Sequence, residues 1–146
     1  MTPTGARPLT IHEMSRRSGF SEATLRYYER IGLLGAVERD RANGHRRYGP
    51  ATADRVEALA CLRSSGMTVE GLRRYVRLLA RGDEAAGDLR QLFADQAGEL
   101  AAEIDRLRVR HEYLTLKAQL WDARSRRDRE TEADVVARVE KTARAF

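Results

Sequence analysis

The sequence predicts a mainly α-helical protein in which a small N-terminal domain is followed by one long helix. Three observations support this fold class. Two short helix patterns, joined by a glycine-containing turn, occupy residues 10–32. An Asn-Gly pair then stands between two short arms rich in arginine, which is a hairpin signal. Finally, apolar residues recur every three or four positions from Phe93 to Trp121, the spacing of a coiled coil.

Charge is unevenly distributed along the 146 residues. Residues 1–82 hold fifteen Arg against eight Asp or Glu, whereas residues 83–146 hold twelve Lys or Arg against fourteen Asp or Glu. A basic half beside a near-neutral half favours a polyanionic partner for the first half alone. The sequence has no run of eighteen apolar residues and no apolar leader. We therefore expect a cytoplasmic protein without a membrane partner.

The composition also argues against an enzyme. A single cysteine, Cys61, excludes an intrachain disulfide and a cysteine-cluster metal site. The three histidines fall on an expected helix, a hairpin and the coiled-coil repeat, and no glycine-rich phosphate loop is present. We expect no catalytic residue, no metal and no cofactor.

The N-terminal pattern predicts a helix-turn-helix. Residues 1–8 have no periodicity and predict a disordered tail. Thr10 and Glu13 form a capping box at the start of the first helix, which Gly19 ends. Ser21 is the expected cap of a second helix. Two short helices with so tight a turn are typical of this motif.

The second helix has the residue types that a DNA-reading helix needs. Leu25 suits its inward side, whereas Arg26 can bind guanine O6 and N7 or a phosphate, and the hydroxyl of Tyr27 suits a phosphate oxygen. Taken alone, an outward arginine and tyrosine on this helix are also compatible with an ordinary surface helix that binds no DNA. The outward candidates of this helix are Ser21, Thr24, Arg26 and Tyr27, and Arg16 of the first helix is a further DNA-binding candidate.

A hairpin rich in cations is expected next. Residues 33–48 have no helical period, and Asn43-Gly44 predicts a hairpin because both residues tolerate positive φ. A recognition helix followed by such a wing can bind both a DNA groove and the DNA phosphate backbone, which strengthens the DNA-binding interpretation. The arms carry Arg39, Arg41, His45, Arg46, Arg47 and Tyr48.

Two more helices complete the predicted domain. Pro50 after Gly49 marks the first turn of a third helix, and Thr68 caps a fourth. Residues 81–87 are interpreted as a linker. One face of the third helix holds Val56, Leu59, Ala60 and Arg63, and the fourth has Val69, Leu72, Tyr75, Val76 and Leu79 in helical register.

The long C-terminal helix has a heptad seam over about 42 Å. The four short helices are too small to cover it, so we expect the seam to pair with a second copy. The alternative is a helix folded back onto its own domain. His111 is expected to be a polar residue that sets register. The seam comprises Phe93, Ala97, Leu100, Ile104, Leu107, His111, Leu114, Ala118 and Trp121.

The last residues are mostly charged. Val135, Val136, Val139 and Phe146 give only one or two weak amphipathic turns. The expected domains are a disordered tail (1–8), a winged helix-turn-helix DNA-binding domain (9–82), a dimerisation helix (88–123) and a charged C-terminal tail (124–146).

Two stretches of the sequence resemble the MerR family of bacterial transcription regulators. They are LTIHEMSRRSGFSEATLRYYERIGLL and NGHRRYGPATADRVEALACLRSSGMTVEGLRRYV. The resemblance implies a homodimer, joined by an antiparallel coiled coil, on a palindrome of double-stranded promoter DNA. Bending and untwisting that DNA would realign promoter hexamers that lie too far apart. RNA polymerase is then an indirect partner, through the promoter.

The same resemblance assigns roles to individual residues. It places Arg26 and Tyr27 at the major groove. It places a first wing on the DNA backbone, formed by Arg46, Arg47 and Tyr48. Arg63 resembles a contact of the second wing.

The segments ALACLRSSGMTVEGL and RLLARGDEAAGDLRQLF resemble the AdhR/NmlR-like branch, which responds to aldehyde and thiol stress. That likeness makes Cys61 the candidate sensor. From the residues alone, Cys61 lies about 140° around the helix from Val56 and is off the apolar stripe. Glu57 and Asp54, one and two turns earlier, would disfavour a thiolate. A structural cysteine is the alternative.

Two other functions fit parts of the pattern. A DNA-architectural or recombination accessory protein could use the same winged helix, since that fold does not fix its use. A coiled-coil adaptor could bind acidic proteins through its basic half. Arg26, Tyr27 and the Asn-Gly wing disfavour the adaptor, which would not require them.

Overall fold

The computed structural model describes residues 7–146, so most of the expected disordered tail lies outside the described residues. The described residues fall into two compact units, one ending at residue 92 and one comprising 93–146. The chain is mainly helical, and the described part contains one two-stranded sheet.

Helix α1 (Ile11–Ser18) begins with the predicted capping box. The Thr10 hydroxyl accepts from the Glu13 amide, and the Glu13 carboxylate accepts from the Thr10 amide, both at 3.1 Å. The backbone bond from Thr10, aided by the ion pair with Arg7, holds the pKa of Glu13 below its ordinary value. Gly19 ends the helix with φ of +82°, as its place in the sequence predicts.

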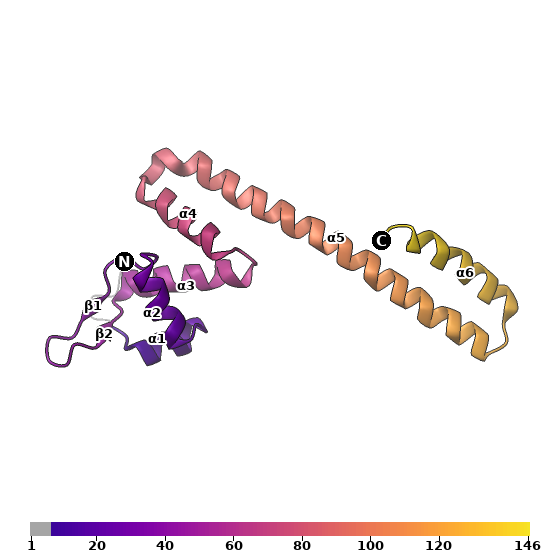
Figure 1. Ribbon diagram of the computed structural model, residues 1–146, viewed down its shortest axis with the longest axis horizontal. Coiled ribbons are helices and arrows are strands. Elements are labelled where there is room, and N and C mark those ends of the chain that lie inside the picture. Colours follow the sequence, from indigo (N-terminus) through magenta and orange to yellow (C-terminus); the bar gives the residue numbers. More distant parts are fainter. Residues whose placement is uncertain (1–6) are drawn as a thin grey trace. The chain divides into compact units, whose positions relative to one another are not determined.

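Helix α2 (Glu22–Arg30) follows after a three-residue turn, and the two helices form the helix-turn-helix (Figure 1). Ser21 is its cap and accepts from the Thr24 amide at 3.0 Å, as predicted. The helix stops at Ile31, and Gly32 then turns the chain with φ of +84°.

The wing is a minimal hairpin of β1 (Glu38–Arg39) and β2 (Arg46–Arg47). Glu38 pairs with Arg47, and Arg39 pairs with Arg46, in an antiparallel register. A separate bridge next to it joins the segment before α1 to the residue after β2, where Leu9 and Tyr48 exchange two backbone hydrogen bonds of 2.8 Å. The hairpin is confirmed, but two residues per strand make it marginal by itself.

The turn of the wing differs from the prediction. Gly44 has φ of +71°, but Asn43 is not among the residues with positive φ. Instead, Asn43 accepts from the His45 amide through its side chain at 2.9 Å. The Asp40 carboxylate accepts from the Ala42 amide at 2.8 Å. A longer loop with two side-chain bonds therefore replaces the expected Asn-Gly turn.

Helices α3 (Pro50–Ser64) and α4 (Val69–Ala80) complete the first unit. Pro50 stands in the first turn of α3, and the Thr68 hydroxyl caps α4 by accepting from Gly71 at 3.1 Å, both as predicted. In α4 the expected Leu72 is completely buried, and of the neighbouring Leu78 and Leu79 it is Leu78, not the expected Leu79, that is buried.

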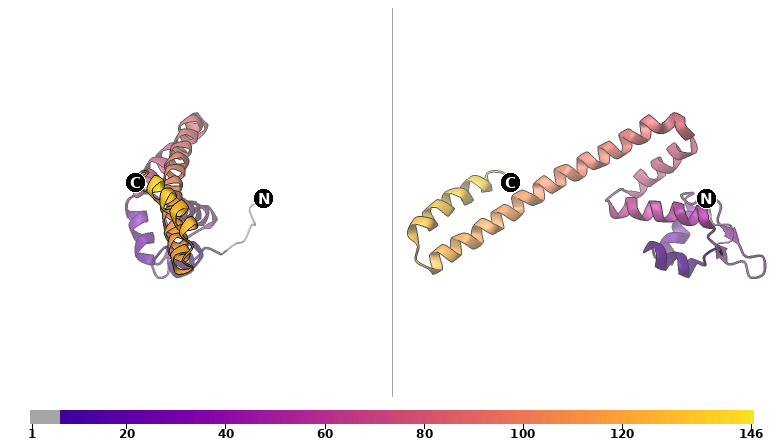
Figure 2. Two further views of the ribbon diagram at one scale, coloured as in Figure 1. Left: turned by 90° about the vertical axis from the view of Figure 1, so that its right-hand side faces the viewer. Right: turned by 180° about the vertical axis from the view of Figure 1, so that it is seen from behind.

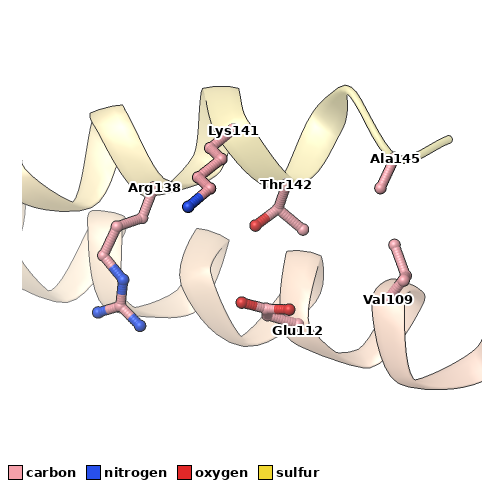
Figure 3. A pocket seen from close by; sticks show the side chains of 6 residues that line it. All are labelled: Val109, Glu112, Arg138, Lys141, Thr142 and Ala145. Atoms are coloured by element: carbon pink, nitrogen blue, oxygen red, sulfur yellow. The ribbon is translucent and has the colours of Figure 1, made fainter. Parts of the chain in front are cut away.

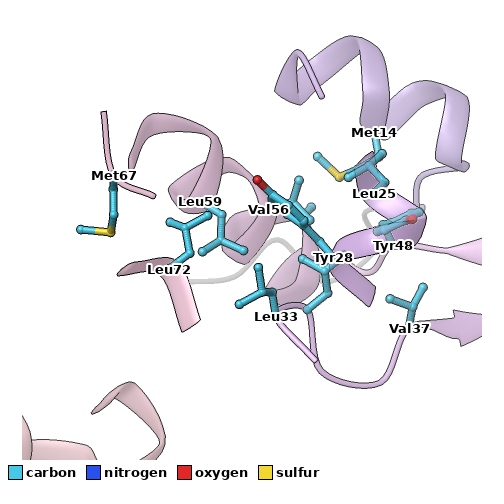
Figure 4. Packing of buried hydrophobic residues seen from close by; sticks show 12 residues of the cluster. Met14, Leu25, Tyr28, Leu33, Val37, Tyr48, Val56, Leu59, Met67 and Leu72 are labelled. Atoms are coloured by element: carbon cyan, nitrogen blue, oxygen red, sulfur yellow. The ribbon is translucent and has the colours of Figure 1, made fainter. Parts of the chain in front are cut away.

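The core of the first unit gathers side chains from α1, α2, α3 and α4 and from the segments that flank the two wing strands (Figure 4). It joins the helix-turn-helix to α3 and α4 and fixes the surface that α2 turns outward. Its fully or nearly buried members are Met14, Leu25, Tyr28, Leu33, Leu34, Val37, Tyr48, Ala53, Val56, Leu59, Met67 and Leu72.

The expected linker at residues 81–87 is wrong. Gly82–Ala85 forms a single 3-10 turn, η1, and α5 (Ala86–Ser125) follows without a break. Gly82 has φ of +72°, and the Ala85 side chain is fully buried. A buried residue inside the turn explains why the segment is ordered.

The charged C-terminal segment, in which the sequence indicates only one or two weak amphipathic turns, forms a longer helix, α6 (Arg129–Ala143). It runs back beside the C-terminal half of α5 (Figures 1 and 2). Asp128 caps it, accepting from the Thr131 amide at 3.1 Å and the Thr131 hydroxyl at 2.7 Å. These bonds hold the pKa of Asp128 below its ordinary value.

Helix α6 covers a second apolar row on α5, on the side away from the heptad seam. Leu116, Leu120 and Val135 are at most 7% exposed, and Val136 and Val139 pack against them. The row spans about 21 Å and α6 about 22 Å, so the two lengths match. The row comprises Val109, Tyr113, Leu116, Leu120 and Ala123, which again alternate by four and three.

No helix among the described residues is both long and apolar enough to cross a membrane.

Candidate nucleic-acid interface

Helix α2 divides into an inward and an outward side. Leu25 is completely buried, as predicted, and Tyr28 is 3% exposed with its ring edge-on to Phe20 at 5.1 Å between centroids. Arg26 and Tyr27 point outward, and Tyr27 is 40% exposed. The two expected groove residues are therefore adjacent on the free side of the helix.

The outward side is held in place by weak contacts. Arg26 lies 3.5 Å from Glu22, with both side chains about half exposed. Such a pair contributes only about 0.3–0.5 kcal/mol, so a phosphate or a base can replace it. Arg30 stacks over the Tyr27 ring at 5.3 Å. Arg30 was missed in the sequence, although its spacing of three from Tyr27 was a signal.

The other two expected residues of α2 cap the helix. The Ser21 hydroxyl donates to the Thr24 hydroxyl at 2.9 Å and accepts from the Thr24 amide. They therefore shape the N-terminus of α2, where backbone amides favour an anion. Arg16 is exposed on α1.

The two expected wing arginines are already engaged within the chain. Arg46 donates from Nε to Glu29 at 2.5 Å, and Arg47 lies 3.1 Å from Asp40. Their side chains are only 24% and 26% exposed. Arg41, which the sequence places in the wing, is exposed in the wing loop.

Tyr48 is a core residue, which corrects the expectation that it contacts the DNA backbone. It is 1% exposed, and its buried hydroxyl has no hydrogen-bond partner among the described residues. Burial raises the pKa of this hydroxyl, and the nearby Glu29 carboxylate raises it further. In this conformation the hydroxyl does not reach a ligand at the surface.

Arg63, the expected second-wing residue, closes the turn between α3 and α4. Its Nη1 donates to the Met67 carbonyl at 2.7 Å. The residue is nevertheless exposed, so other atoms of its guanidinium can meet a phosphate.

Cys61 is exposed on α3, away from the buried stripe of Val56 and Leu59, as its position predicts. Of the carboxylates near it in the sequence, Glu57 is bound by Arg17 through two bonds, of 2.5 Å and 3.3 Å. The negative charge of Glu57 is thus largely balanced by Arg17.

The heptad seam of α5 is uncovered in the isolated chain. Its large apolar members Phe93, Leu100, Ile104, Leu107, Leu114 and Trp121 are 38–68% exposed. Arg124 stacks on the Trp121 ring at 4.7 Å. Six large apolar side chains along one helix face are what a docking surface needs.

Four polar and two apolar residues line the hollow between α5 and α6 (Figure 3). Glu112, Arg138, Lys141 and Thr142 surround it, with Val109 at one end. Within residues 7–146, no three His, Cys, Asp or Glu side chains are grouped closely enough to hold a metal ion.

An exposed helix with arginine and tyrosine at its free side, next to a cationic wing, defines the class of winged helix-turn-helix DNA-binding proteins. Comparison with known proteins narrows this class. The profile of the MerR HTH family regulatory proteins matches residues 9–79. The HTH-type transcriptional regulator HmrR of Rhizobium leguminosarum bv. viciae is 34% identical over 99 residues, 68% of this chain and 75% of that protein. The chain belongs to the MerR family of DNA-binding transcriptional regulators.

Other relatives agree with this assignment. The HTH-type transcriptional regulator AdhR of Bacillus subtilis is 33% identical over 92 residues, 63% of this chain and 65% of that protein, just under two thirds of its length. A MerR family regulator from Listeria monocytogenes has a similar structure, with a TM-score of 0.71 and 29% identity, covering 89% of this chain and 98% of that one. HiNmlR, a MerR family regulator lacking the sensor domain and bound to promoter DNA, also has a similar structure. Its TM-score is 0.66 and its sequence identity 27%, and the match covers 81% of this chain and 94% of that one.

Proposed function

We propose that the chain acts as a homodimer that binds a palindromic promoter element and alters transcription by distorting the DNA. One observation carries this proposal: the heptad seam of α5 is exposed, while the opposite apolar row is covered by the chain's own α6. A second copy is the fitting occupant, because a heptad seam is complementary to another heptad seam. The similarity to HiNmlR, which was solved on promoter DNA, supports the same function.

In this proposal the outward side of α2 enters the major groove. Arg26 and Tyr27 contact bases or phosphates there, with Ser21 and Thr24 at the helix start. The remaining contacts are to the backbone, which positions the protein without reading sequence. They involve Arg16, Arg41, Arg46, Arg47 and Arg63.

Transcription from a defined promoter tests the function. The probe is a duplex that the wild-type protein selects from a random-sequence pool, placed between promoter hexamers with spacers of several lengths. A distorting regulator changes transcript yield only at over-long spacers. A DNA-architectural protein would instead bind many duplexes with little preference and leave the yield independent of spacer length, which would contradict the proposal.

We further propose that an electrophile such as an aldehyde induces the regulator through Cys61. The thiol adds to the aldehyde carbonyl, its sulfur bonds to the carbonyl carbon, and its proton moves to the carbonyl oxygen to give a hemithioacetal. Exposure of Cys61 and the similarity to AdhR support this step. The adduct need only favour one of two DNA-bound states by a few kcal/mol.

Cys61→Ser separates sensing from folding. The residue is exposed, so the new hydroxyl remains hydrated and should leave folding and operator binding intact. We expect the variant to lose the transcriptional response to a small aldehyde. A normal response would show that the thiol has no part in sensing.

A further inference from the structure

Glu29 stands between the recognition helix and the wing. It lies in the last turn of α2, and its side chain is 18% exposed. One carboxylate oxygen is 3.4 Å from Arg39 Nη2 of β1, and the other is 2.5 Å from Arg46 Nε of β2. A single carboxylate thus binds one arginine from each strand.

The register of the wing places two like charges opposite each other. Arg39 and Arg46 are direct cross-strand partners. Like charges opposite each other destabilise a strand pair, and these strands have only two residues each. A carboxylate shared by both guanidinium groups removes that repulsion. It also fixes the hairpin to α2, the helix that faces the DNA in the proposed function.

We infer that Glu29 is a positioning residue for DNA binding, which holds the wing at a set place relative to the recognition helix through Arg39 and Arg46. The role rests on the proposed DNA interface. The Glu29 contacts explain how a sheet of only four residues can hold the wing in place as a second contact with the DNA, beside the recognition helix. The exposed Arg41 lies at the far end of the wing. Its position relative to the DNA backbone then depends on the Glu29 contacts with Arg39 and Arg46, and not on the hairpin alone.

The sign of the effect makes the inference testable. Glu29→Gln makes the domain more positive by one charge, and charge alone would strengthen binding to a polyanion. If Glu29 positions the wing, the same change weakens binding instead. We expect a loss of about tenfold in affinity and a salt dependence lower by about one unit, as for the loss of one phosphate contact.

Glu38→Gln is the matched control. Glu38 is an exposed carboxylate of β1 in the same wing. Its replacement changes the net charge by the same amount but leaves the Glu29 contacts with Arg39 and Arg46 in place. The probe is the duplex selected by the wild-type protein, and affinity is measured by fluorescence anisotropy at several salt concentrations. Thermal unfolding of each variant checks the fold. Glutamine keeps the size of glutamate and can still accept a hydrogen bond, so both variants should remain folded at the temperature of the binding measurement.

Arg39→Gln breaks the contact with Glu29 from the wing side, at a residue that is not among the proposed DNA contacts, and provides a second variant. We expect it to weaken binding in the wild type but little in the Glu29→Gln background, because both changes remove the same Glu29–Arg39 contact. Equal effects in the two backgrounds would overturn the inference. So would a Glu29→Gln variant that binds as tightly as Glu38→Gln or more tightly.

Arg26→Ala distinguishes failure of the inference from failure of the proposed function. If Arg26→Ala weakens binding and Glu29→Gln does not, the interface stands and the positioning role is wrong. If Arg26→Ala also binds normally, the interface itself is wrong.

Discussion

Leu107→Glu tests the proposed dimer at the centre of its seam. Leu107 is the middle one of nine seam positions and is 47% exposed in the chain. An antiparallel partner brings its own residue 107 within about one helical turn, or ~5 Å along the axis. The substitution therefore places two carboxylates close together inside an apolar contact.

The expected loss can be worked from the exposed fraction. Complete burial of a leucine side chain is worth about 1.5–3 kcal/mol, so covering the exposed half of Leu107 gives about 2 kcal/mol for two copies. Two carboxylates about 8 Å apart repel by about 2 kcal/mol at an effective dielectric constant of about 20. The total of about 4 kcal/mol weakens dimerisation roughly a thousandfold.

Light scattering over a range of protein concentrations measures the effect. The control is Ala102→Glu, since Ala102 is exposed on the same helix but faces away from the seam. We expect Leu107→Glu to be monomeric where the wild type and Ala102→Glu are dimeric. Leu107→Lys should also be monomeric, and mixing the Glu and Lys variants should restore a dimer. A full-strength Leu107→Glu dimer, or a mixture of folded monomers, would refute the reasoning.

Three further changes address the remaining parts of the structure. Val135→Asp places a carboxylate in the core between α5 and α6, where Val135 is 5% exposed; it should lower the stability of the chain by about 1–3 kcal/mol in thermal unfolding and leave the dimer intact. Tyr48→Phe removes a buried hydroxyl without a partner among the described residues, so stability should stay the same or rise by up to about 1 kcal/mol and operator affinity should not change; a tenfold loss of affinity would return Tyr48 to the DNA interface. The backbone amide of Ala42 and the guanidinium of Arg47 hold the pKa of Asp40 below its ordinary value of 3.8. Such a group adds stability above its unfolded pKa that is lost as pH falls through the folded value, so the wild-type melting temperature should decline below about pH 4 more steeply than that of Asp40→Asn; parallel profiles would contradict this.

The helix starts could be predicted because their signals are local. Thr10, Ser21 and Thr68 each bond to an amide three residues later, so residue type and spacing suffice. The heptad seam is equally visible as a period. These features gave the helix order, and the capped pair with its wing led to the DNA-binding class.

The partners of the wing arginines could not be predicted, because they depend on tertiary contacts. Glu29 is ten residues from Arg39 and seventeen from Arg46. A run of cations in a hairpin is therefore compatible with free arginines or paired ones. Tyr48 presents the same problem: its place at the end of a short strand does not reveal that its ring enters the core.

Helix α6 was missed for a different reason. Its charged residues hide a short apolar face, and the prediction for α5 rested on the heptad seam alone and not on the second apolar row. The row from Val109 to Ala123 does alternate by four and three. A search for a second period on the long helix would have predicted that something covers it.

Selection of duplexes from a random-sequence pool, followed by measuring the mass of the complex, tests whether the chain binds a symmetric DNA site as a dimer. We expect an enriched sequence with two-fold symmetry, bound by two copies of the chain, and lost with Arg26→Ala. Failure to enrich any symmetric sequence, or binding by one copy that Arg26→Ala leaves unchanged, would contradict this expectation.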